Sequence, residues 1–326
     1  MRRARTLILL LLVPAAGCRG MQHALDPVSG EAAFISNLSW LLYCGATLIF
    51  VTVMALAAYA IFGPRGRNPL AHRNLIIGGG IVFPAVTLTA LMIYAFVGAP
   101  NLLLRGEPEL HIEVTGEQFW WRVRYLDAAG KAQFETANEI VIPAGTTVAF
   151  HLRTADVIHS FWVPNLHGKL DMIPGHPKTM HVHAERTGQY RGQCAEYCGT
   201  QHAKMAFVVE VVAADAFEQW RRAQGNEARA PDTPLLQRGR EVFLTSGCAT
   251  CHTVRGTSTG GALGPDLTHV GSRRTIGAGL LPNGIGALGG WIADSQALKP
   301  GNRMPAFNSL PAADLQAVAA YMASLE

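Results

Sequence analysis

The sequence predicts a multidomain membrane protein with a two-helix transmembrane hairpin, a β-sandwich or barrel domain and an all-α domain. Three observations support this fold class. Two long apolar runs contain no charged residue, the next region is rich in β-branched and aromatic residues, and residues 235–326 change to a helical pattern. Hydrophobic residues make up 49% of the chain and charged residues 15%, and the net charge of +4 is too small to indicate a nucleic-acid partner.

Residues 1–17 resemble a secretory signal peptide of the lipoprotein type. Arg2, Arg3 and Arg5 precede a short apolar run, and small residues follow this run up to Cys18. The run is too short to span a bilayer. We therefore expect export, with Cys18 lipidated at the mature N-terminus; the alternative is an ordinary cleaved signal with an incidental cysteine.

Residues 18–100 are expected to form an N-terminal segment and two membrane-spanning helices. The apolar runs 34–62 and 75–97 both reach the about 20 residues that a helix needs to cross a bilayer core. The short loop between them carries Arg65 and Arg67, and basic loops usually remain in the cytoplasm. Both ends of the hairpin, and everything after it, then lie on the extracytoplasmic side.

The exported region divides into two predicted domains joined by a linker. Residues 101–225 contain stretches such as HIEVTGEQFWWRVRY and EIVIPAGTTVAFHL, which are typical of short strands in a sandwich or barrel. A short helical stretch ends this domain. Residues 226–234 are polar and rich in proline, as in a linker. Residues 235–326 form the all-α domain.

The motif CATCH at residues 248–252 is typical of covalent attachment of a c-type haem. Cys248 and Cys251 would bond the haem vinyl groups, and His252 would ligate the iron. A thioredoxin-like dithiol would follow a strand rather than a helix. A zinc site would need a second ligand pair, and only His269 stands nearby. The export signal agrees with haem attachment.

Met304, in the stretch KPGNRMPAF, is the expected second axial ligand of the haem iron. Met322 is the competitor, although its spacing within the last helix is typical of core packing. The stretch GPDL at residues 264–267 resembles the loop of class I cytochromes c in which Pro265 would brace the proximal histidine. This resemblance covers residues 235–326.

A second cluster of metal-binding residue types lies in the stretch GQCAEYCGTQHAKM. It contains Cys194, Cys198, His202 and Met205, and His159 lies upstream in DVIHSFWVPNL. The spacing alone leaves a disulfide, a zinc site and a copper site open. Met205 and a distant histidine favour copper, because thiolate and thioether ligands beside imidazole suit that metal.

Residues 30–212, with DVIHSFWVPNL, GKLDMIPG and GQYRGQCAEYCGTQHAKM, resemble subunit II of haem–copper cytochrome c oxidases. The resemblance implies a cupredoxin fold that holds the binuclear copper centre CuA, and the fused C-terminal cytochrome resembles the caa-type oxidases. The implied copper ligands are two bridging thiolates, two imidazoles, a weak axial thioether and a backbone carbonyl, from Cys194, Cys198, His159, His202, Met205 and Glu196. The carboxylate of Glu196 would help hold a magnesium or manganese ion beside subunit I.

The resemblance also implies a function and a location. The chain would pass electrons from its haem c to CuA and on to subunit I, where O2 is reduced and protons are translocated. Its partners would be subunit I, other oxidase subunits and an external donor, either a cytochrome c or the bc complex. It would lie in the bacterial inner membrane, with both termini and the metal domains on the periplasmic side.

Two positions depart from the family pattern. In GEQFWW, Phe119 stands where the first tryptophan of an aromatic run often occurs, followed by Trp120 and Trp121. These three residues are candidates for the electron path, and packing within a strand is the alternative. Ile77 stands where many members carry a glutamate at the mouth of a proton channel. That proton route is therefore expected to be absent or to use another residue.

The main alternative function is a membrane-anchored copper-binding or copper-delivery lipoprotein with an accessory cytochrome. Such a protein would need fewer and more exposed ligands. Nitrous oxide reductase also carries CuA, but its propeller is missing here, and the quinol oxidases lack the two cysteines. Residues 106–230 hold 12 basic and 15 acidic side chains, whereas residues 235–326 hold 7 and 5. This small difference favours transient contact between the two domains, and ordinary solvated faces are the alternative.

Overall fold

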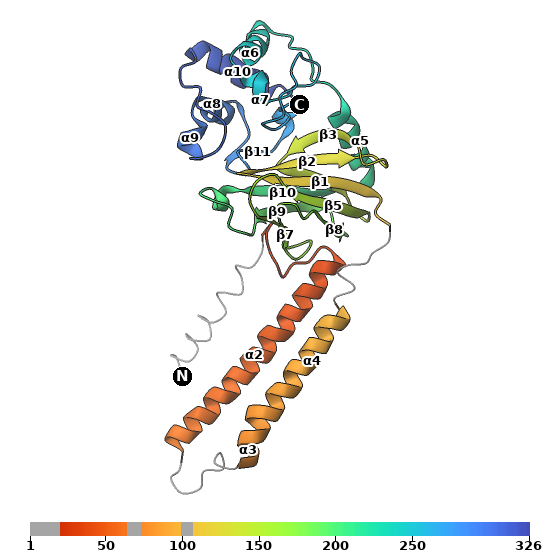
Figure 1. Ribbon diagram of the computed structural model, residues 1–326, viewed down its shortest axis with the longest axis vertical. Helices are drawn as coiled ribbons and strands as arrows, with labels where there is room; N and C mark the ends of the chain where they lie inside the picture. The colour runs from red at the N-terminus through yellow and green to blue at the C-terminus, as the bar shows by residue number, and fades with distance from the viewer. Residues whose placement is uncertain (1–19, 64–72, 99–106) are drawn as a thin grey trace, which may run out of the picture.

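The computed structural model describes residues 20–63, 73–98 and 107–326. The predictions for the signal peptide, Cys18, Arg65 and Arg67 concern residues outside these ranges. Figure 1 shows three parts stacked along the long axis, with two long helices at one end, a β domain in the middle and a helical domain at the other end.

Two described helices are long and apolar enough to cross a membrane. The first, α2 (Gly30–Phe62), begins before residue 34 because Ser29 caps it, with its Oγ accepting a hydrogen bond from Ala32 N at 3.0 Å. The second is a continuous run made of α3 (Arg73–Ile77), the π-helical turn η3 (Gly78–Val82) and α4 (Phe83–Gly98).

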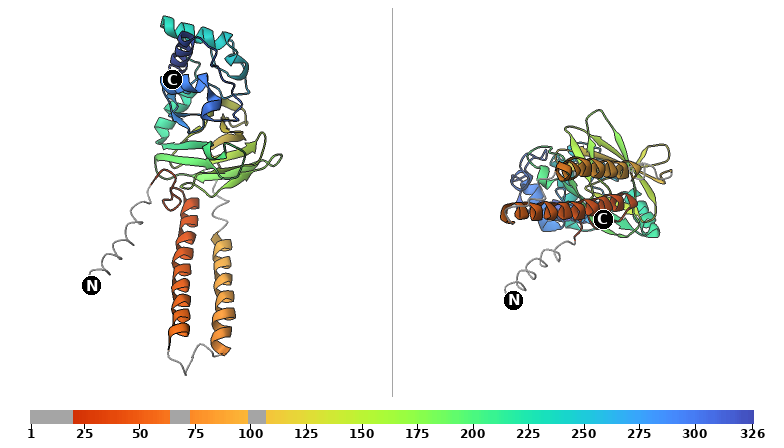
Figure 2. Two further views of the ribbon diagram at one scale, coloured as in Figure 1. Left: turned by 90° about the vertical axis from the view of Figure 1, so that its left-hand side faces the viewer. Right: turned by 90° about the horizontal axis from the view of Figure 1, so that it is seen from below.

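The outer end of α2 is held against the β domain. Val28 N donates to Asn165 O at 2.8 Å, and the Ser29 hydroxyl also donates to Leu166 O. Ser29 and Leu166 are both buried. These bonds set the position of the β domain relative to the membrane end of the chain (Figure 2).

The β domain is a sandwich of two five-stranded sheets, as the sequence predicted. One sheet has the strand order β3-β2-β1-β5-β8 and the other β4-β10-β9-β6-β7. Pairs β1/β5 and β4/β10 are parallel and the remaining pairs are antiparallel. The strands of the first sheet are β1 (Leu110–Glu117), β2 (Trp120–Leu126), β3 (Ala132–Ala137), β5 (Thr147–Thr154) and β8 (Lys178–His183). Those of the second are β4 (Glu139–Pro143), β6 (His159–Trp162), β7 (Leu170–Met172), β9 (Gly188–Cys194) and β10 (Ala206–Val212).

Aromatic side chains fill the core between the sheets next to the candidate copper ligands. The rings of Phe161 and Phe207 stack with centroids 4.7 Å apart, and Trp121 lies 4.9 Å from Phe207. All three are almost fully buried. Such pairs add to the stability that burial of their area gives. The helix α5 (Ala214–Gly225) closes this domain.

The helical domain packs its first and last long helices against each other. Its helices are α6 (Pro234–Thr245), α7 (Cys248–Cys251), α8 (Ile285–Ala293), α9 (Ser295–Leu298) and α10 (Ala312–Ala323), with a short hairpin of β11 (Thr275–Ile276) and β12 (Leu281–Pro282). Gly239 permits the close approach of α6 and α10, because a Cβ there would collide with the Ala317 carbonyl oxygen and lie 2.6 Å from Tyr321 Cβ.

The helical domain lies directly on the β domain (Figures 1 and 2). Two ion pairs cross between the domains, from Arg274 Nη2 to Glu210 Oε1 at 2.8 Å and from Arg303 Nη2 to Asp156 Oδ2 at 3.1 Å. Both place a basic side chain of the helical domain on an acidic one of the β domain. The contact expected from the charge difference is therefore present.

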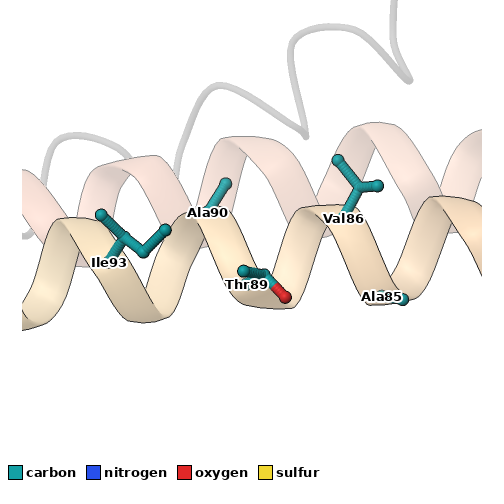
Figure 3. Close-up of a pocket in the computed structure, with 5 residues that line it drawn as sticks. All are labelled: Ala85, Val86, Thr89, Ala90 and Ile93. Atoms are coloured by element: carbon teal, nitrogen blue, oxygen red, sulfur yellow. The ribbon is translucent and has the colours of Figure 1, made fainter.

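A shallow groove on α4 carries no chemistry of its own. It is lined by Ala85, Val86, Thr89, Ala90 and Ile93 (Figure 3). The Thr89 hydroxyl is the one side-chain polar group among these five residues, and the groove lies on a candidate membrane span. The candidate functional residues lie elsewhere.

Candidate metal centres

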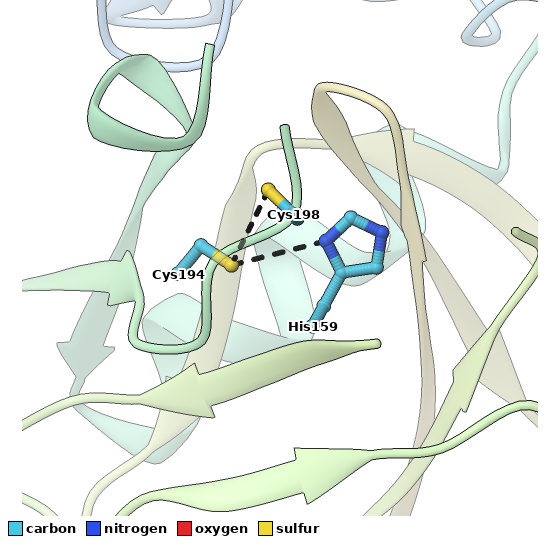
Figure 4. Close-up of side chains that lie close together, drawn as sticks. All are labelled: His159, Cys194 and Cys198. Atoms are coloured by element: carbon cyan, nitrogen blue, oxygen red, sulfur yellow. Dashed lines mark hydrogen bonds between the residues drawn. The ribbon is translucent and has the colours of Figure 1, made fainter. Parts of the chain in front are cut away.

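The structure brings His159 together with the two cysteines of the predicted copper cluster. His159 begins β6, Cys194 ends β9, and these neighbouring strands pair in register at Phe161 and Cys194. His159 Nδ1 lies 3.8 Å from Cys194 Sγ, which lies 3.8 Å from Cys198 Sγ (Figure 4). The three donor atoms lie within 4.8 Å of one another, and their side chains are buried. This distance range suits ligands that share a metal site.

The other predicted ligands divide into two groups around the cysteine pair. Cys194 Sγ lies 3.2 Å from the carbonyl oxygen of Glu196 and 3.8 Å from His159 Nδ1. Cys198 Sγ lies 3.7 Å from His202 Nδ1 and 3.8 Å from Met205 Sδ. Each thiol therefore has one imidazole and one weaker donor beside it, an arrangement that fits two metal ions sharing both thiolates.

The two cysteines are not joined in a disulfide. Their 3.8 Å separation is nearly twice the length of a sulfur–sulfur bond. The hydrogen bond from Cys198 lowers the pKa of Cys194 and raises that of Cys198 itself, because the pair shares one proton. These opposite directions favour Cys194 as the thiolate of the pair, and the thiolate is the form that binds metals.

Asp156 orients His159, a role that the sequence analysis did not assign. Its Oδ1 lies 2.9 Å from His159 Nε2, so the ring donates there and leaves Nδ1 facing Cys194. Burial alone would lower the pKa of His159, but the hydrogen bonds with Asp156 and Cys194 outweigh it and raise that pKa. In the sequence, the position of Asp156 three residues before His159 could have indicated this role.

Gly116 leaves room for the His159 ring. A Cβ at this position would lie 2.8 Å from His159 Cδ2 and 2.9 Å from Cγ. Gly116 sits in β1, whose neighbour β5 belongs to the same sheet. The ring of the candidate ligand His159, from the second sheet, therefore packs against the backbone of Gly116 in the first sheet.

The three aromatic candidates for the electron path have different surroundings. Trp121 is fully buried, packs 6.1 Å from the His159 ring and donates from Nε1 to Met205 O at 3.4 Å. Trp120 is half-buried, with the Arg122 guanidinium 4.7 Å from its ring centroid. Phe119 is 6% exposed. Trp121 therefore contacts two of the predicted copper ligands.

The predicted haem residues lie around α7, which is formed by the CATCH motif itself. His252 follows this helix, and its Nδ1 donates to Pro265 O at 2.8 Å. This bond leaves Nε2 free for a metal, as expected of a proximal ligand. A Cβ at Gly264 would lie 2.7 Å from His252 Nδ1, so this glycine fits the ring closely. Burial lowers the pKa of His252, which favours the neutral ring that binds iron.

The two candidate methionines occupy different environments. Met322 is 3% exposed within α10 and belongs to the helical core. Met304 lies in a loop, and its Sδ accepts a hydrogen bond from Trp291 Nε1 at 3.2 Å. Of the two methionines, Met304 is the one that does not belong to a packed helix, as the prediction of a loop ligand requires.

The Glu196 side chain is 43% exposed. Its Oε2 lies 3.2 Å from Lys169 Nζ, which also lies 2.9 Å from Asp171 Oδ1. The carboxylates of Glu196 and Asp171 are thus both paired with the Lys169 ammonium group. Ile77 ends α3 and contributes no titratable group there.

Two family models match the β domain and the helical domain. Residues 112–212 match the family described as cytochrome c oxidase subunit II, periplasmic domain, and residues 236–326 match the cytochrome c family. The cytochrome c oxidase subunit 2 of Alkalihalophilus pseudofirmus is 34% identical, over 95% of this chain and 93% of that relative. The chain belongs to the cytochrome c oxidase subunit II family.

Other relatives of this subunit II cover less of its length. The cytochrome c oxidase subunit 2 of Bacillus sp. strain PS3 is 29% identical, over 76% of this chain and 70% of that relative. The solved periplasmic domain of cytochrome oxidase subunit II of Bradyrhizobium japonicum is 31% identical. It covers 37% of this chain and 96% of its own, with a TM-score of 0.35.

Family membership establishes the general role of this subunit II. It is an electron-transfer component of a haem–copper oxidase, an oxidoreductase complex. Its two domains imply copper and haem as cofactors, and its helices indicate a membrane protein with an extracellular domain. The alternative of a copper-delivery lipoprotein is not favoured by these relatives.

Proposed function

We propose that this subunit II passes electrons from a haem c bound in its helical domain to a binuclear CuA centre in its β domain, and on to subunit I for O2 reduction. The observation that carries the proposal is the division of donors around the cysteine pair. His159 and the Glu196 carbonyl lie beside Cys194, whereas His202 and Met205 lie beside Cys198. A single metal would not need two such sets.

The copper ligands would be Cys194, Cys198, His159, His202, Met205 and the Glu196 carbonyl. When bound there, copper would supply one-electron transfer. The chain supplies what this exchange requires: buried donors, an oriented His159 and a thioether suited to copper rather than zinc. A rigid site favours fast electron transfer because little rearrangement accompanies the change in charge.

The haem would be attached through Cys248 and Cys251 and held between His252 and Met304. When bound with these ligands it is a one-electron carrier of raised potential. Pro265 fixes the proximal ring through its carbonyl. Trp291 donates to the thioether on the distal side. Phe119, Trp120 and Trp121 remain candidates for the path toward copper.

The location and partners follow from the same proposal. The chain would sit in the bacterial inner membrane with both termini outside, carrying a lipid on Cys18. It would accept electrons from a cytochrome c or the bc complex and assemble with subunit I and other oxidase subunits. Glu196, already paired with Lys169 at the surface, would turn to a magnesium or manganese ion at the subunit I interface.

Electron paramagnetic resonance of the purified full chain, loaded with copper and haem, tests the proposal. We expect a low-spin c-type haem and a mixed-valence copper signal with its hyperfine coupling spread over two nuclei. The matched control is Cys198→Ser, which should lose the two-nucleus pattern and keep the haem signal. A one-copper pattern in the parent chain, or zinc alone on metal analysis, would contradict the CuA assignment.

A further inference from the structure

A buried lysine lies at the contact between the two metal domains. Lys299 follows α9 in the helical domain, and its residue is 2% exposed. Its Nζ donates to Phe119 O at 2.7 Å and Lys204 O at 2.8 Å in the β domain, and to Gly277 O at 2.8 Å in its own domain. Lysine is rarely buried so completely.

The three carbonyl oxygens match what an ammonium group requires. A lysine ammonium has three N–H donors and no acceptor, so three backbone carbonyls satisfy it fully. Moving a charge from water into a protein interior is costly unless its hydrogen bonds are replaced. Separation of the domains would remove two of the three acceptors. Burial lowers the pKa of Lys299 to about 7, so its ammonium form depends on these carbonyls, two of which belong to the β domain.

Lys299 holds a strained loop in place. Gly277, Ala278 and Gly279 have φ angles of 65°, 63° and 78°, three left-handed residues in a row. Alanine adopts this conformation at a cost that the surroundings must offset. Lys299 binds the Gly277 carbonyl, and Ala206 N donates to the Ala278 carbonyl at 3.1 Å. The loop is thus fixed from both domains.

This loop connects the surroundings of a candidate haem ligand with those of a candidate copper ligand. On the haem side, Trp291 donates to Met304 Sδ, and its Cζ3 would lie 2.9 Å from a Cβ at Gly277. On the copper side, Ala206 and Lys204 flank Met205. Contacts therefore run from Met304 to Trp291, from Trp291 to the loop Gly277–Gly279, and from this loop to the backbone beside Met205. The Lys299 ammonium group binds this loop at the Gly277 carbonyl.

We propose that Lys299 is a positioning residue for electron transfer between the two domains, holding the loop Gly277–Gly279 against the segment Lys204–Ala206. The inference rests on the proposed electron transfer from haem c to CuA. It identifies the domain contact across which the electron would pass. The two cross-domain ion pairs described above are more exposed, with side-chain exposures of 51% for Arg274 and 63% for Arg303. Exposed ion pairs contribute little to holding two surfaces together.

The test uses the full chain in detergent and compares Lys299→Met with Arg274→Gln. Lys299→Met keeps an unbranched side chain but leaves three carbonyls without their donor. Arg274→Gln removes an exposed cross-domain ion pair and is the matched control. The first measurement is hydrogen exchange of the segments 203–208 and 275–280 in copper-free protein. We expect exchange to be faster by roughly tenfold or more in Lys299→Met and unchanged in Arg274→Gln.

The second measurement is the rate of copper reduction after rapid reduction of the haem in the loaded chain. Lys299→Met should slow this step at least tenfold and make it depend on solvent viscosity, because the domains must first find each other. The haem potential and the copper spectrum should stay as in the parent, which a general loss of structure would not allow. If Lys299→Met does not retain haem, the shorter polar variant Lys299→Gln takes its place.

Three outcomes would overturn the inference. They are unchanged hydrogen exchange in the lysine variants, an unchanged and viscosity-independent rate, or an equal effect in Arg274→Gln. Failure of the proposed function is seen separately, as the absence of a two-nucleus copper signal in the parent chain. Hydrogen exchange in copper-free protein tests Lys299 even in that case.

Discussion

Asp156 and His159 are joined by a hydrogen bond of 2.9 Å between Oδ1 and Nε2. The other carboxylate oxygen, Oδ2, accepts from Gln118 N at 2.8 Å and from Arg303 Nη2 of the helical domain at 3.1 Å. Asp156 is thus shared between the orientation of a candidate copper ligand and the contact between the domains. Substitutions can separate these two tasks.

Asp156→Ala should weaken copper binding by about 10- to 100-fold, because His159 loses the partner that fixes its ring and tautomer. Isothermal titration of the copper-free chain with copper measures the effect. Arg303→Gln is the control, since it removes only the cross-domain ion pair and should leave copper affinity within a few-fold of the parent. Equal losses in both variants would mean that domain contact, rather than ring orientation, supports the site.

Gly116→Ala should displace the His159 ring, because the added Cβ would lie 2.8 Å from Cδ2. We expect a changed copper spectrum and a loss of about 1–3 kcal/mol in the free energy of unfolding of the β domain. Gly225→Ala, where a Cβ meets no atom within 4 Å, is the control. A copper spectrum identical to that of the parent would show that His159 lies elsewhere in the loaded protein.

Met304→Ala should lower the haem reduction potential, because a thioether ligand stabilises reduced iron. Axial ligation covers a range of about 0.8 V in haem proteins, so the shift should be easily resolved by redox titration. Met322→Leu keeps the volume of a core side chain and should leave the potential unchanged at a stability cost below about 1.5 kcal/mol. The reverse pattern would assign the axial role to Met322.

Stability of the β domain should fall as the pH drops below 6.5, in part because of His151. Burial first, and then the neighbouring His111, lower the pKa of His151 below its ordinary value of 6.5. As the pH falls, the unfolded chain takes up this proton before the folded one, so folding is penalised until the pH passes the folded pKa. His151 also faces Glu113, Arg153 and Thr179.

Thermal unfolding followed by tryptophan fluorescence at pH 7.5, 6.5 and 5.5 measures this dependence. His151→Asn should reduce the fall in the unfolding midpoint between pH 6.5 and 5.5. His183→Asn is the control, since its ring contacts Thr147 rather than another histidine. Parallel curves for the parent and the His151 variant would contradict the assignment.

The sequence predicted most of the candidate copper site because four of its ligands share one short stretch. Cys194, Cys198, His202 and Met205 lie within twelve positions, so a single loop brings them together in almost any β fold. His159 is 35 positions away from Cys194, and its placement depended on the pairing of β6 with β9. Family resemblance rather than periodicity supplied the assignment of His159 as a ligand.

The contact between the domains could not be read from the sequence. Lys299 donates to the Phe119 carbonyl, which lies 180 positions away in the chain. Every residue has a backbone carbonyl, so the amino-acid sequence does not indicate which one will accept this bond. A lysine in a loop is ordinarily expected in solvent. Net charge did indicate that the domains attract each other, but a sum of charges says nothing about which surfaces meet.

The first residues of the linker between the domains are held against the helical domain. Ala228 N donates to Arg255 O at 3.0 Å, and the ring of His269 lies 3.2 Å from Asn226 O. A reductant and its acceptor built into one polypeptide have a fixed one-to-one stoichiometry, so dilution of the oxidase in the membrane leaves their reaction first order. Sensitivity to ionic strength then belongs to the step in which an outside carrier reaches the haem. In the proposed relay, competition among respiratory enzymes for an outside carrier would be decided at the cytochrome surface, before copper is involved.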